Sequence, residues 1–221
     1  MTIKAVIFDF DGTIIDTETI WFDVYKEVIK EKFNLVLPLE EFVKVIGTTD
    51  EVMFQYIENQ VGVKIDPVEI NALAHQRFSE KKAILVVREG VKEKLDEARA
   101  LGLKIGLASS SSREWVEGFL RQFDLWHYFS VVKTKEDVAK VKPDPALYIK
   151  ALEELQVEPH EALAIEDSAN GALAAVEAGM ECIVIPNQVT AFLTFHEKTI
   201  RSESFADFSF NKVGFLSDTF L

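Results

Sequence analysis

The segment KAVIFDFDGT, residues 4–13, places an apolar run directly before two aspartates, Asp9 and Asp11. Continuous Val, Ile and Phe residues predict a strand of a parallel sheet that is buried on both faces. Side chains two residues apart on a strand point to the same side, so both carboxylates should face one site at its carboxyl end. Open parallel sheets bind ligands there, and a divalent cation would relieve the repulsion between the carboxylates. An Asx turn that simply ends the strand explains D-x-D-G nearly as well.

Four further apolar runs indicate that this strand belongs to a larger sheet. They cover residues 104–108, 129–132, 162–165 and 182–185. Helical patterns lie between them, and Ser111 with Glu114 forms an S-x-x-E capping box that should begin one helix. The alternation of strands and helices predicts an α/β fold. The Phe-rich tail, SESFADFSF at 202–210 and VGFLSDTFL at 213–221, should supply an edge strand and a closing segment.

Residues 18–85 interrupt this alternation, because they contain no convincing strand. Apolar residues between 20 and 29 recur at helical spacing, and Asp66-Pro67 should begin another long helix. The gap is longer than a normal crossover, which favours an all-helical insertion over helices that pack on one face of the sheet. We therefore predict a core domain of residues 1–16 and 86–221 and a cap domain of residues 17–85, with hinges near Asp16 and Val86.

Polar residues follow the apolar runs. Ser109 and Ser110 come after 104–108, where hydroxyls beside the free N–H groups of a helix start can contact a phosphate. Serines at such places also simply cap helices, which is the role expected of Ser111. Lys142 precedes Pro143, whose ring favours an extended backbone and a rigidly presented ammonium. A solvated loop lysine would show the same pattern.

Glu166 and Asp167 end the run 162–165, where an apolar strand gives no structural reason for two acids. Their carboxylates are hard oxygen ligands of the kind that Mg²⁺ prefers. The bend after the strand would have to turn one of them for both to reach one ion.

The composition limits the partners. The chain of 221 residues has 24 Lys and Arg against 37 Asp and Glu, a net charge of −13, which argues against nucleic acid and anionic membranes. Small anionic substrates are disfavoured too, unless local positive charge overcomes the field. The single cysteine, Cys182, excludes an internal disulfide and should be an inert buried thiol. Without a signal-peptide pattern or an apolar run of membrane length, we expect a cytoplasmic monomer.

Four motifs, taken in order, resemble those of the haloacid dehalogenase (HAD) superfamily, in its phosphatase and β-phosphoglucomutase-like branch. They are DFDGT at 9–13, the serine after GLA at Ser109, KPDP from Lys142, and IEDSANG around Glu166 and Asp167. The resemblance runs from residue 3 to 187. It implies a Rossmann-like core with a parallel sheet and an inserted all-helical cap.

The resemblance also implies roles for the residues. Asp9 resembles the nucleophile that takes the phosphoryl group as an aspartyl phosphate, and Asp11 resembles the general acid/base. The implied ligands of Mg²⁺ are Asp9, the Asp11 backbone carbonyl, Asp167 and, directly or indirectly, Glu166. The groups implied to bind the phosphoryl oxygens are Ser109, Ser110 and Lys142.

Two departures bear on the function. Asp50 stands where the mutases carry an arginine for a second phosphate, and Trp21 stands where they show a histidine. Both favour a Mg²⁺-dependent phosphatase acting on a small phosphorylated metabolite such as a sugar phosphate. The alternatives are a sugar phosphomutase and a catalytically idle regulator that binds a phosphorylated ligand. The cap residues expected to read the substrate are Glu18, Trp21, Thr48 and Arg77.

Overall fold

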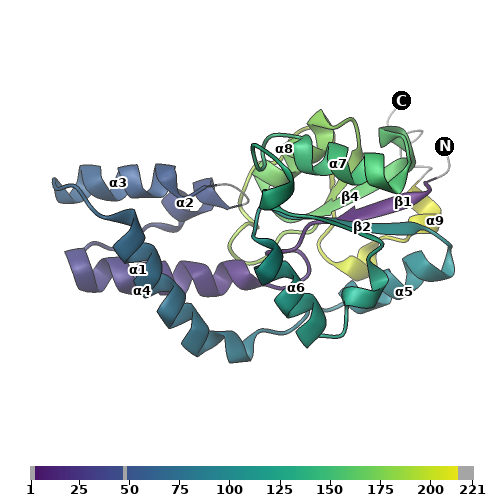
Figure 1. Cartoon of the computed structure of the whole chain (residues 1–221). Coiled ribbons are helices and arrows are strands. Elements are labelled where there is room, and N and C mark those ends of the chain that lie inside the picture. The colour runs from purple at the N-terminus through teal and green to yellow at the C-terminus, as the bar shows by residue number, and fades with distance from the viewer. Residues whose placement is uncertain (1–2, 47–48, 214–221) are drawn as a thin grey trace.

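A six-stranded parallel sheet organises the chain, whose computed structural model describes residues 3–46 and 49–213 (Figure 1). The strands lie in the order β3-β2-β1-β4-β5-β6. Their bounds are β1 Ala5–Phe8, β2 Lys104–Ala108, β3 Val131–Lys133, β4 Ala162–Glu166, β5 Glu181–Val184 and β6 Thr199–Arg201. The order reverses between β1 and β4, and the carboxyl ends of strands beside such a switch point form a crevice.

Helices cover both faces of this sheet. On one face, α7 (Ala146–Leu155) and α8 (Ala169–Glu177) pack on the alternate strand residues Ala5, Ile7 and Ala164. On the other face, α5 (Val91–Ala100) and α6 (Arg113–Gln122) pack on Val6, Phe8 and Leu107. The sheet is therefore buried on both sides, as its continuous apolar runs predicted. Short 3₁₀ turns cover Trp126–Tyr128, Lys135–Asp137 and Pro159–Glu161.

Four helices between β1 and β2 form a separate lobe beyond the carboxyl ends of the strands (Figure 1). They are α1 (Thr17–Phe33), α2 (Leu39–Phe42), α3 (Glu51–Val61) and α4 (Pro67–Lys81), with 3₁₀ turns at Val43–Val45 and Lys82–Ile84. Within the described part of residues 17–85 no strand occurs, so the all-helical insertion is confirmed. The domain boundaries at 16/17 and 85/86, and the hinges there, stay predictions.

Local sequence explains why the long helices of the insertion begin where they do. The Asp16 carboxylate accepts a hydrogen bond from the Thr19 N–H at 3.2 Å and caps α1. Asp66 caps α4 in the same way, through the Val68 N–H at 2.9 Å, and Pro67 occupies the first helical position. Of the residues predicted from helical spacing, Val24 and Val28 are buried, whereas Trp21 is partly buried.

The prediction for the Phe-rich tail is wrong. The edge strand is β6, upstream of it, and residues 202–210 instead contain the 3₁₀ turn Phe205–Asp207 and the start of α9 (Phe210–Val213). The Ser204 hydroxyl accepts from the Ala206 N–H at 3.2 Å and donates to Asp207 at 2.8 Å, which stabilises a turn in place of a strand. Most of the predicted closing segment, residues 214–221, lies outside the described residues.

Two further expectations concern Cys182 and membranes. Cys182 is buried in β5, where burial raises the pKa of its thiol, so its predicted inertness agrees with its surroundings. In the described part of the chain, none of the helices has the length and apolarity needed to span a membrane.

Candidate active site

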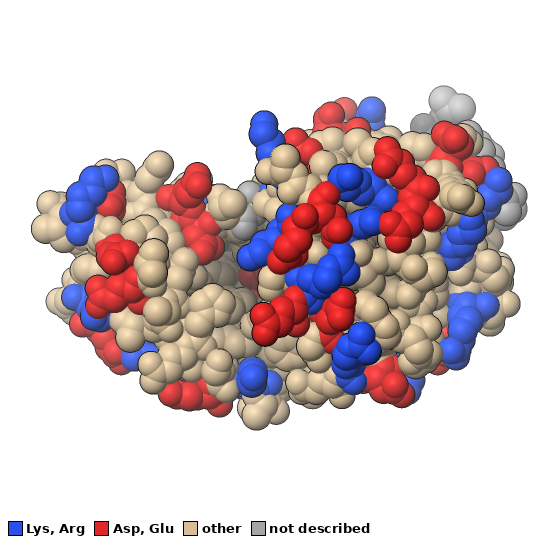
Figure 2. Space-filling model, in the orientation of Figure 1, with Lys and Arg blue, Asp and Glu red and all other residues tan. Residues whose placement is uncertain are grey.

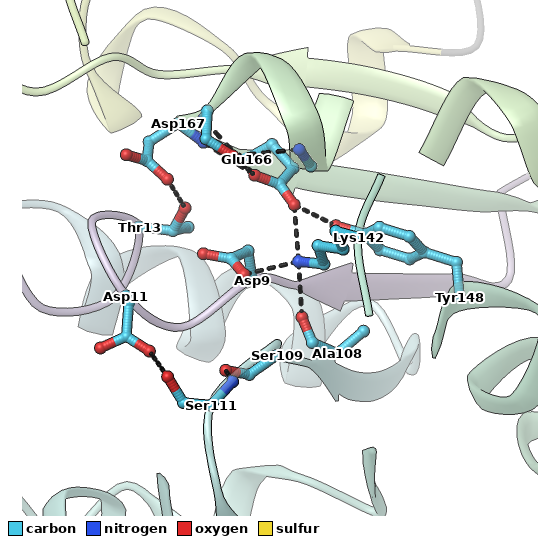
Figure 3. A network of polar contacts seen from close by, with 12 residues as sticks. Asp9, Asp11, Thr13, Ala108, Ser109, Ser111, Lys142, Tyr148, Glu166 and Asp167 are labelled. Carbon is cyan, nitrogen blue, oxygen red and sulfur yellow. Dashed lines mark hydrogen bonds and ion pairs between the residues drawn. The ribbon is translucent and has the colours of Figure 1, made fainter. Parts of the chain in front are cut away.

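The site lies at the switch point of the sheet, where the residues that follow β1, β2 and β4 meet (Figure 3). Asp9 follows β1 directly, and its N–H donates to the Ile165 carbonyl of β4 at 2.9 Å. Ser109 follows β2, and Glu166 is the last residue of β4. Because adjacent parallel strands end at one edge, residues more than 150 positions apart in sequence become neighbours.

Lys142 connects these strand ends. Its side chain is 1% exposed, and its ammonium donates to Asp9 Oδ1 at 2.5 Å, Glu166 Oε1 at 2.7 Å and the Ala108 carbonyl at 2.8 Å. Burial alone would lower the pKa of Lys142, but the carboxylates of Asp9 and Glu166 raise it above its ordinary value. The buried ammonium therefore stays charged and fixes both carboxylates.

Three buried acids crowd around one point. Asp9, Glu166 and Asp167 each offer a carboxylate oxygen, and these oxygens lie within 4.8 Å of one another. Burial, together with the charge of Glu166, raises the pKa of Asp9 to about 7, and burial with the charge of Asp9 raises the pKa of Asp167 well above its usual range. A hard divalent cation would satisfy such an oxygen-only set, so these residues fit a metal of the magnesium type.

Asp167 is held by two donors. Thr13 Oγ1 donates to Asp167 Oδ1 at 3.2 Å, and Asn187 Nδ2 donates to Oδ2 at 2.8 Å. Asn187 is itself fixed, because its Oδ1 accepts the N–H groups of Val189 and Thr190 at 2.9 and 3.0 Å. The turn after β5 therefore orients a carboxylate at the end of β4.

Gly12 and Arg88 close this side of the site. A Cβ atom at Gly12, whose φ is +81°, would lie 2.2 Å from Asp167 Oδ2, so only glycine fits there. The Arg88 guanidinium donates to the Gly12 carbonyl, to the Ile185 carbonyl at 3.0 Å and to the Pro186 carbonyl at 2.9 Å. Arg88 thus joins the loop after β1 to the loop after β5.

Glu166 has protein donors on both oxygens. Oε1 accepts from Lys142 and from the Tyr148 hydroxyl, the latter at 2.6 Å. Oε2 accepts from the Asp167 N–H and the Ser168 hydroxyl, each at 3.2 Å. This carboxylate is therefore oriented more completely than that of Asp9 or Asp167.

The Asp11 carboxylate is engaged differently from that of Asp9. Its Oδ1 accepts from the Thr17 hydroxyl and the Trp115 indole N–H, both at 2.9 Å, and its Oδ2 accepts from the Ser111 hydroxyl at 2.6 Å. Burial raises the pKa of Asp11, and these three donors oppose the rise. Since β1 ends at Phe8, strand alternation does not set the directions of the two aspartates, but both line the same cavity.

The capping role expected of Ser111 is wrong. Helix α6 begins at Arg113, and the Ser112 hydroxyl caps it by accepting from the Trp115 N–H at 3.3 Å. Ser111 is left to contact Asp11, while its N–H donates to the Ser109 hydroxyl at 3.0 Å. Ser109 is buried, and Ser109 and Ser110 line the cavity together with Ser111.

The cavity, of about 300 Å³, lies between the sheet domain and the helical lobe, where Figure 2 shows the surface hollowed. Its core side carries Asp9, Asp11 and the serines after β2. Its lobe side is lined by Glu18, Trp21, Tyr25, Phe42, Val45, Ile46, Asp50 and His75.

Two of the four substrate-reading residues predicted for the lobe, Glu18 and Trp21, reach this cavity. Arg77 does not, and we correct its assignment: its guanidinium forms ion pairs with Glu31 at 2.5 Å and Glu27 at 3.7 Å on α1. Thr48 lies outside the described residues.

Several side chains that fix the site were not predicted from the sequence. Those that hold the carboxylates are Thr13, Thr17, Arg88, Trp115, Tyr148, Ser168 and Asn187. Asn187 could have been predicted as a site residue, because it is a polar residue that follows an apolar run, 182–185, as Asp9 and Ser109 follow the runs before them. Arg88 and Trp115 lie in ordinary amphipathic surroundings and gave no such indication.

Comparison with known proteins places this site in a family. Residues 6–185 match the model described as haloacid dehalogenase-like hydrolase. The putative phosphatase YhcW of Bacillus subtilis is 47% identical over 206 residues, which cover 93% of each chain. A phosphorylated carbohydrates phosphatase of Thermotoga maritima is 31% identical over 81% of this chain and 83% of its own. Among solved structures, CbbY from Rhodobacter sphaeroides in complex with phosphate matches with a TM-score of 0.77 and 30% identity, covering 93% of this chain and 96% of that one.

Proposed function

The chain belongs to the haloacid dehalogenase-like hydrolases, and on that premise we propose that it dephosphorylates a small metabolite through an aspartyl phosphate on Asp9. It is an enzyme that hydrolyses phosphoric monoesters, as its relatives named phosphatases do. One observation carries the proposal. Asp9 stands at the switch point of the sheet, where one carboxylate contacts the buried Lys142 ammonium and belongs to the acidic cluster.

In the first half-reaction, an Asp9 oxygen attacks phosphorus, and the bond from phosphorus to the leaving oxygen breaks. Oδ1 is held by Lys142, which keeps the carboxylate oriented while Oδ2 can approach the substrate. Asp11 lines the same cavity and gives a proton to the leaving alcohol. In the second half-reaction, Asp11 takes a proton from water, the water oxygen attacks phosphorus, and the Asp9 carboxylate is released.

Negative charge on the phosphoryl oxygens is the main quantity to stabilise in this reaction. The hydroxyls of Ser109 and Ser110 are proposed to bind those oxygens, together with the Lys142 ammonium, which would exchange one of its three present acceptors for a phosphoryl oxygen. Mg²⁺, held by the Asp9 carboxylate, the Asp11 backbone carbonyl and Asp167, would supply the remaining positive charge when bound. The net charge of −13 disfavours small anionic substrates, and local positive charge of this kind would overcome that repulsion within the site.

Glu166 is proposed to orient the site more than to bind the metal directly. Both of its oxygens already accept hydrogen bonds from Lys142, Tyr148, Asp167 and Ser168. A carboxylate so occupied fixes the ammonium of Lys142 and the turn that presents Asp167.

The lining of the cavity supports a phosphatase over a mutase. A mutase must hold a second phosphate on the lobe side, where this chain presents Asp50 in the place of the mutase arginine. Asp50 lines the cavity, and burial raises the pKa of its carboxyl. Whether protonated or ionised, this side chain offers no positive charge to attract a second phosphate, as a mutase requires, and the complete set of catalytic side chains argues against an idle binding protein.

The test of the proposed function is hydrolysis of p-nitrophenyl phosphate by metal-stripped enzyme, before and after Mg²⁺ is restored. We expect release of inorganic phosphate that EDTA abolishes and Mg²⁺ recovers, and a panel of phosphorylated sugars and polyols then ranks the substrates. Absence of hydrolysis with Mg²⁺, or full activity after exhaustive metal removal, would overturn the proposal.

A further inference from the structure

Phe205, in the Phe-rich tail, is a buried aromatic residue that the proposed chemistry does not use. It is 2% exposed and packs against Gly90, where α5 begins. A Cβ atom at Gly90, whose φ is +86°, would lie 2.6 Å from the Phe205 Cβ, so glycine admits Phe205 to this place. The centroid of its ring lies 5.5 Å from the guanidinium carbon of Arg88. A ring at this distance attracts the guanidinium and restricts its movement.

The backbone of Arg88 is fixed as well. Arg88 lies in the segment that returns from the helical lobe to the sheet domain, and its N–H donates to the Ile14 carbonyl at 2.9 Å. Beside it, Val87 forms an antiparallel bridge with Ile15. The side chain of Arg88 is thus held by paired backbone at one end and by Phe205 at the other.

The guanidinium of Arg88 binds three backbone carbonyls in two loops. It donates to the Gly12 carbonyl after β1, and to the carbonyls of Ile185 and Pro186 after β5 at 3.0 and 2.9 Å. A guanidinium presents its N–H donors in a rigid planar fork, which a lysine ammonium cannot reproduce. Arg88 therefore fixes the separation of two loops that are far apart in the sequence.

Each of these loops carries one of the two side chains that hold Asp167. Thr13, next to Gly12, donates to Asp167 Oδ1 at 3.2 Å, and Asn187, next to Pro186, donates to Oδ2 at 2.8 Å. The separation of the loops consequently sets the orientation of the carboxylate between them. Because Asp167 belongs to the acidic cluster that fits a metal ion, this orientation affects how well the cluster binds the ion.

We propose that Arg88 and Phe205 are positioning residues of the metal site. Phe205 holds the guanidinium, the guanidinium holds the loops after β1 and β5, and these loops orient Asp167 for binding Mg²⁺. The inference rests on the proposed function, in which Asp167 is a metal ligand, and it gives the tail a part in supporting that ligand. Groups that orient a metal ligand change metal affinity by about tenfold to a hundredfold without touching the ion.

The dissociation constant (Kd) of Mg²⁺ tests the proposal directly. It is measured on metal-free, full-length protein by competition with Mn²⁺, whose unbound fraction gives an EPR signal. Arg88→Lys keeps the positive charge that acts on Asp167 and removes the planar fork, so the Kd should rise by about tenfold. At saturating Mg²⁺ the kcat for p-nitrophenyl phosphate should recover, because the ligand itself is intact.

Arg121→Lys is the matched control. Arg121 also stacks on an aromatic ring, with its guanidinium carbon 4.5 Å from the centroid of Trp126, but it is exposed and pairs with Glu117 at 3.4 Å. The same substitution there should leave the Mg²⁺ Kd unchanged. The Tm of each metal-free variant is recorded as well, since a purely structural role would lower the Tm and leave the Kd as it is.

Phe205→Leu tests the contribution of the tail. Leu keeps the side chain apolar but removes the ring beside Arg88, so the Kd should rise by about threefold, the size expected of a lost cation–π contact. Phe208→Leu is its control, because that ring lies over the Lys94 ammonium at 4.5 Å, and it should leave the Kd unchanged. The double variant Phe205→Leu,Arg88→Lys should bind Mg²⁺ about as well as Arg88→Lys alone, since Phe205 acts through Arg88.

Two results would overturn the inference. One is an Arg88→Lys protein whose Mg²⁺ Kd changes no more than that of Arg121→Lys, and the other is a Phe205→Leu protein whose Tm falls while its Kd stays at the wild-type value. Phe205→Leu decides the question if Arg88→Lys does not fold. Failure of the proposed function is distinct, because it appears in the wild type, as p-nitrophenyl phosphate hydrolysis that is absent or independent of Mg²⁺.

Discussion

Replacement of Asp167 by Asn should abolish the response of the protein to Mg²⁺ without weakening the metal-free fold. Asn keeps the shape of the side chain, its oxygen can accept from Asn187, and its amide can donate to the Thr13 hydroxyl. The change removes one negative charge from three carboxylates whose oxygens lie within 4.8 Å of one another. The variant therefore loses a proposed ligand and relieves a repulsion at the same time.

The size of the repulsion follows from the spacing. Two carboxylates 4.8 Å apart repel by about 3 kcal/mol at an effective dielectric constant of about 20. The pKa of Asp9, raised from 3.8 to about 7, gives a similar figure, about 4 kcal/mol. The pKa of Asp9 is higher in the folded state than in the unfolded state, so protonation of Asp9 stabilises the fold. This contribution to the free energy of unfolding is complete below pH 3.8 and is lost as the pH rises through about 7.

Thermal unfolding at several pH values, followed by circular dichroism, measures both effects. For the wild type we expect the metal-free Tm to fall as the pH rises through 7, and Mg²⁺ at about 100 times its Kd to raise it by about 5–10 °C, equivalent to about 2.7 kcal/mol. For Asp167→Asn we expect a metal-free Tm at least equal to that of the wild type at neutral pH, higher above it, and no Mg²⁺ response at the same concentration.

Asp124→Asn is the matched control, since Asp124 has a 98% exposed side chain and a φ of 56° that Asn tolerates. It should keep the full Mg²⁺ response. An Asp167→Asn protein that still gains stability from Mg²⁺ refutes the ligand role, and one whose metal-free Tm drops by several degrees refutes the argument from repulsion.

Three further substitutions test other parts of the site. Asp11→Asn should accept a phosphoryl group from p-nitrophenyl phosphate but hydrolyse the phosphoenzyme slowly, which rapid quench detects; wild-type rates with good and poor leaving groups would exclude Asp11 as the acid/base. Trp115→Phe keeps the ring but removes one of three donors to Asp11, so kcat for alkyl phosphates should fall by about tenfold and more than for p-nitrophenyl phosphate; equal losses would mean that the indole N–H is only structural. Asp50→Arg should tighten binding of bisphosphates relative to monophosphates. In the wild type, ³¹P NMR of a reaction with β-glucose 1-phosphate should show inorganic phosphate as the product. Formation of glucose 6-phosphate faster than inorganic phosphate would favour a mutase.

The elements that carry the chemistry were predictable because their signals are local. An apolar run followed by a polar residue marks the end of a buried parallel strand, and this rule located Asp9, Ser109 and Glu166 before any contact was known. The helical insertion was predictable for the same reason, since period and helix-start signals at Asp66-Pro67 lie within a few residues of one another.

What the sequence did not predict depends on contacts between distant segments. Trp115 reaches Asp11 across 104 residues, and Arg88 reaches Gly12 across 76. In each pair, the sequence around one residue gives no indication of its contact with the other. Ser111 and Ser112 show the same limit at close range, because both are plausible caps and only the contact of Ser111 with Asp11 decides between them. At the tail, Ser204 and Asp207 stabilised a turn where aromatic content had favoured a strand.

The most direct test of the central claim is the location of the phosphoryl group during turnover. Asp11→Asn enzyme, mixed with p-nitrophenyl phosphate and Mg²⁺, is quenched with acid, digested and sequenced by mass spectrometry. The account predicts one phosphoryl group on the carboxylate of Asp9, sensitive to hydroxylamine, and none in an Asp9→Asn,Asp11→Asn double variant. A phosphoryl group on a serine or histidine, or one that persists when Asp9 is replaced, would contradict it.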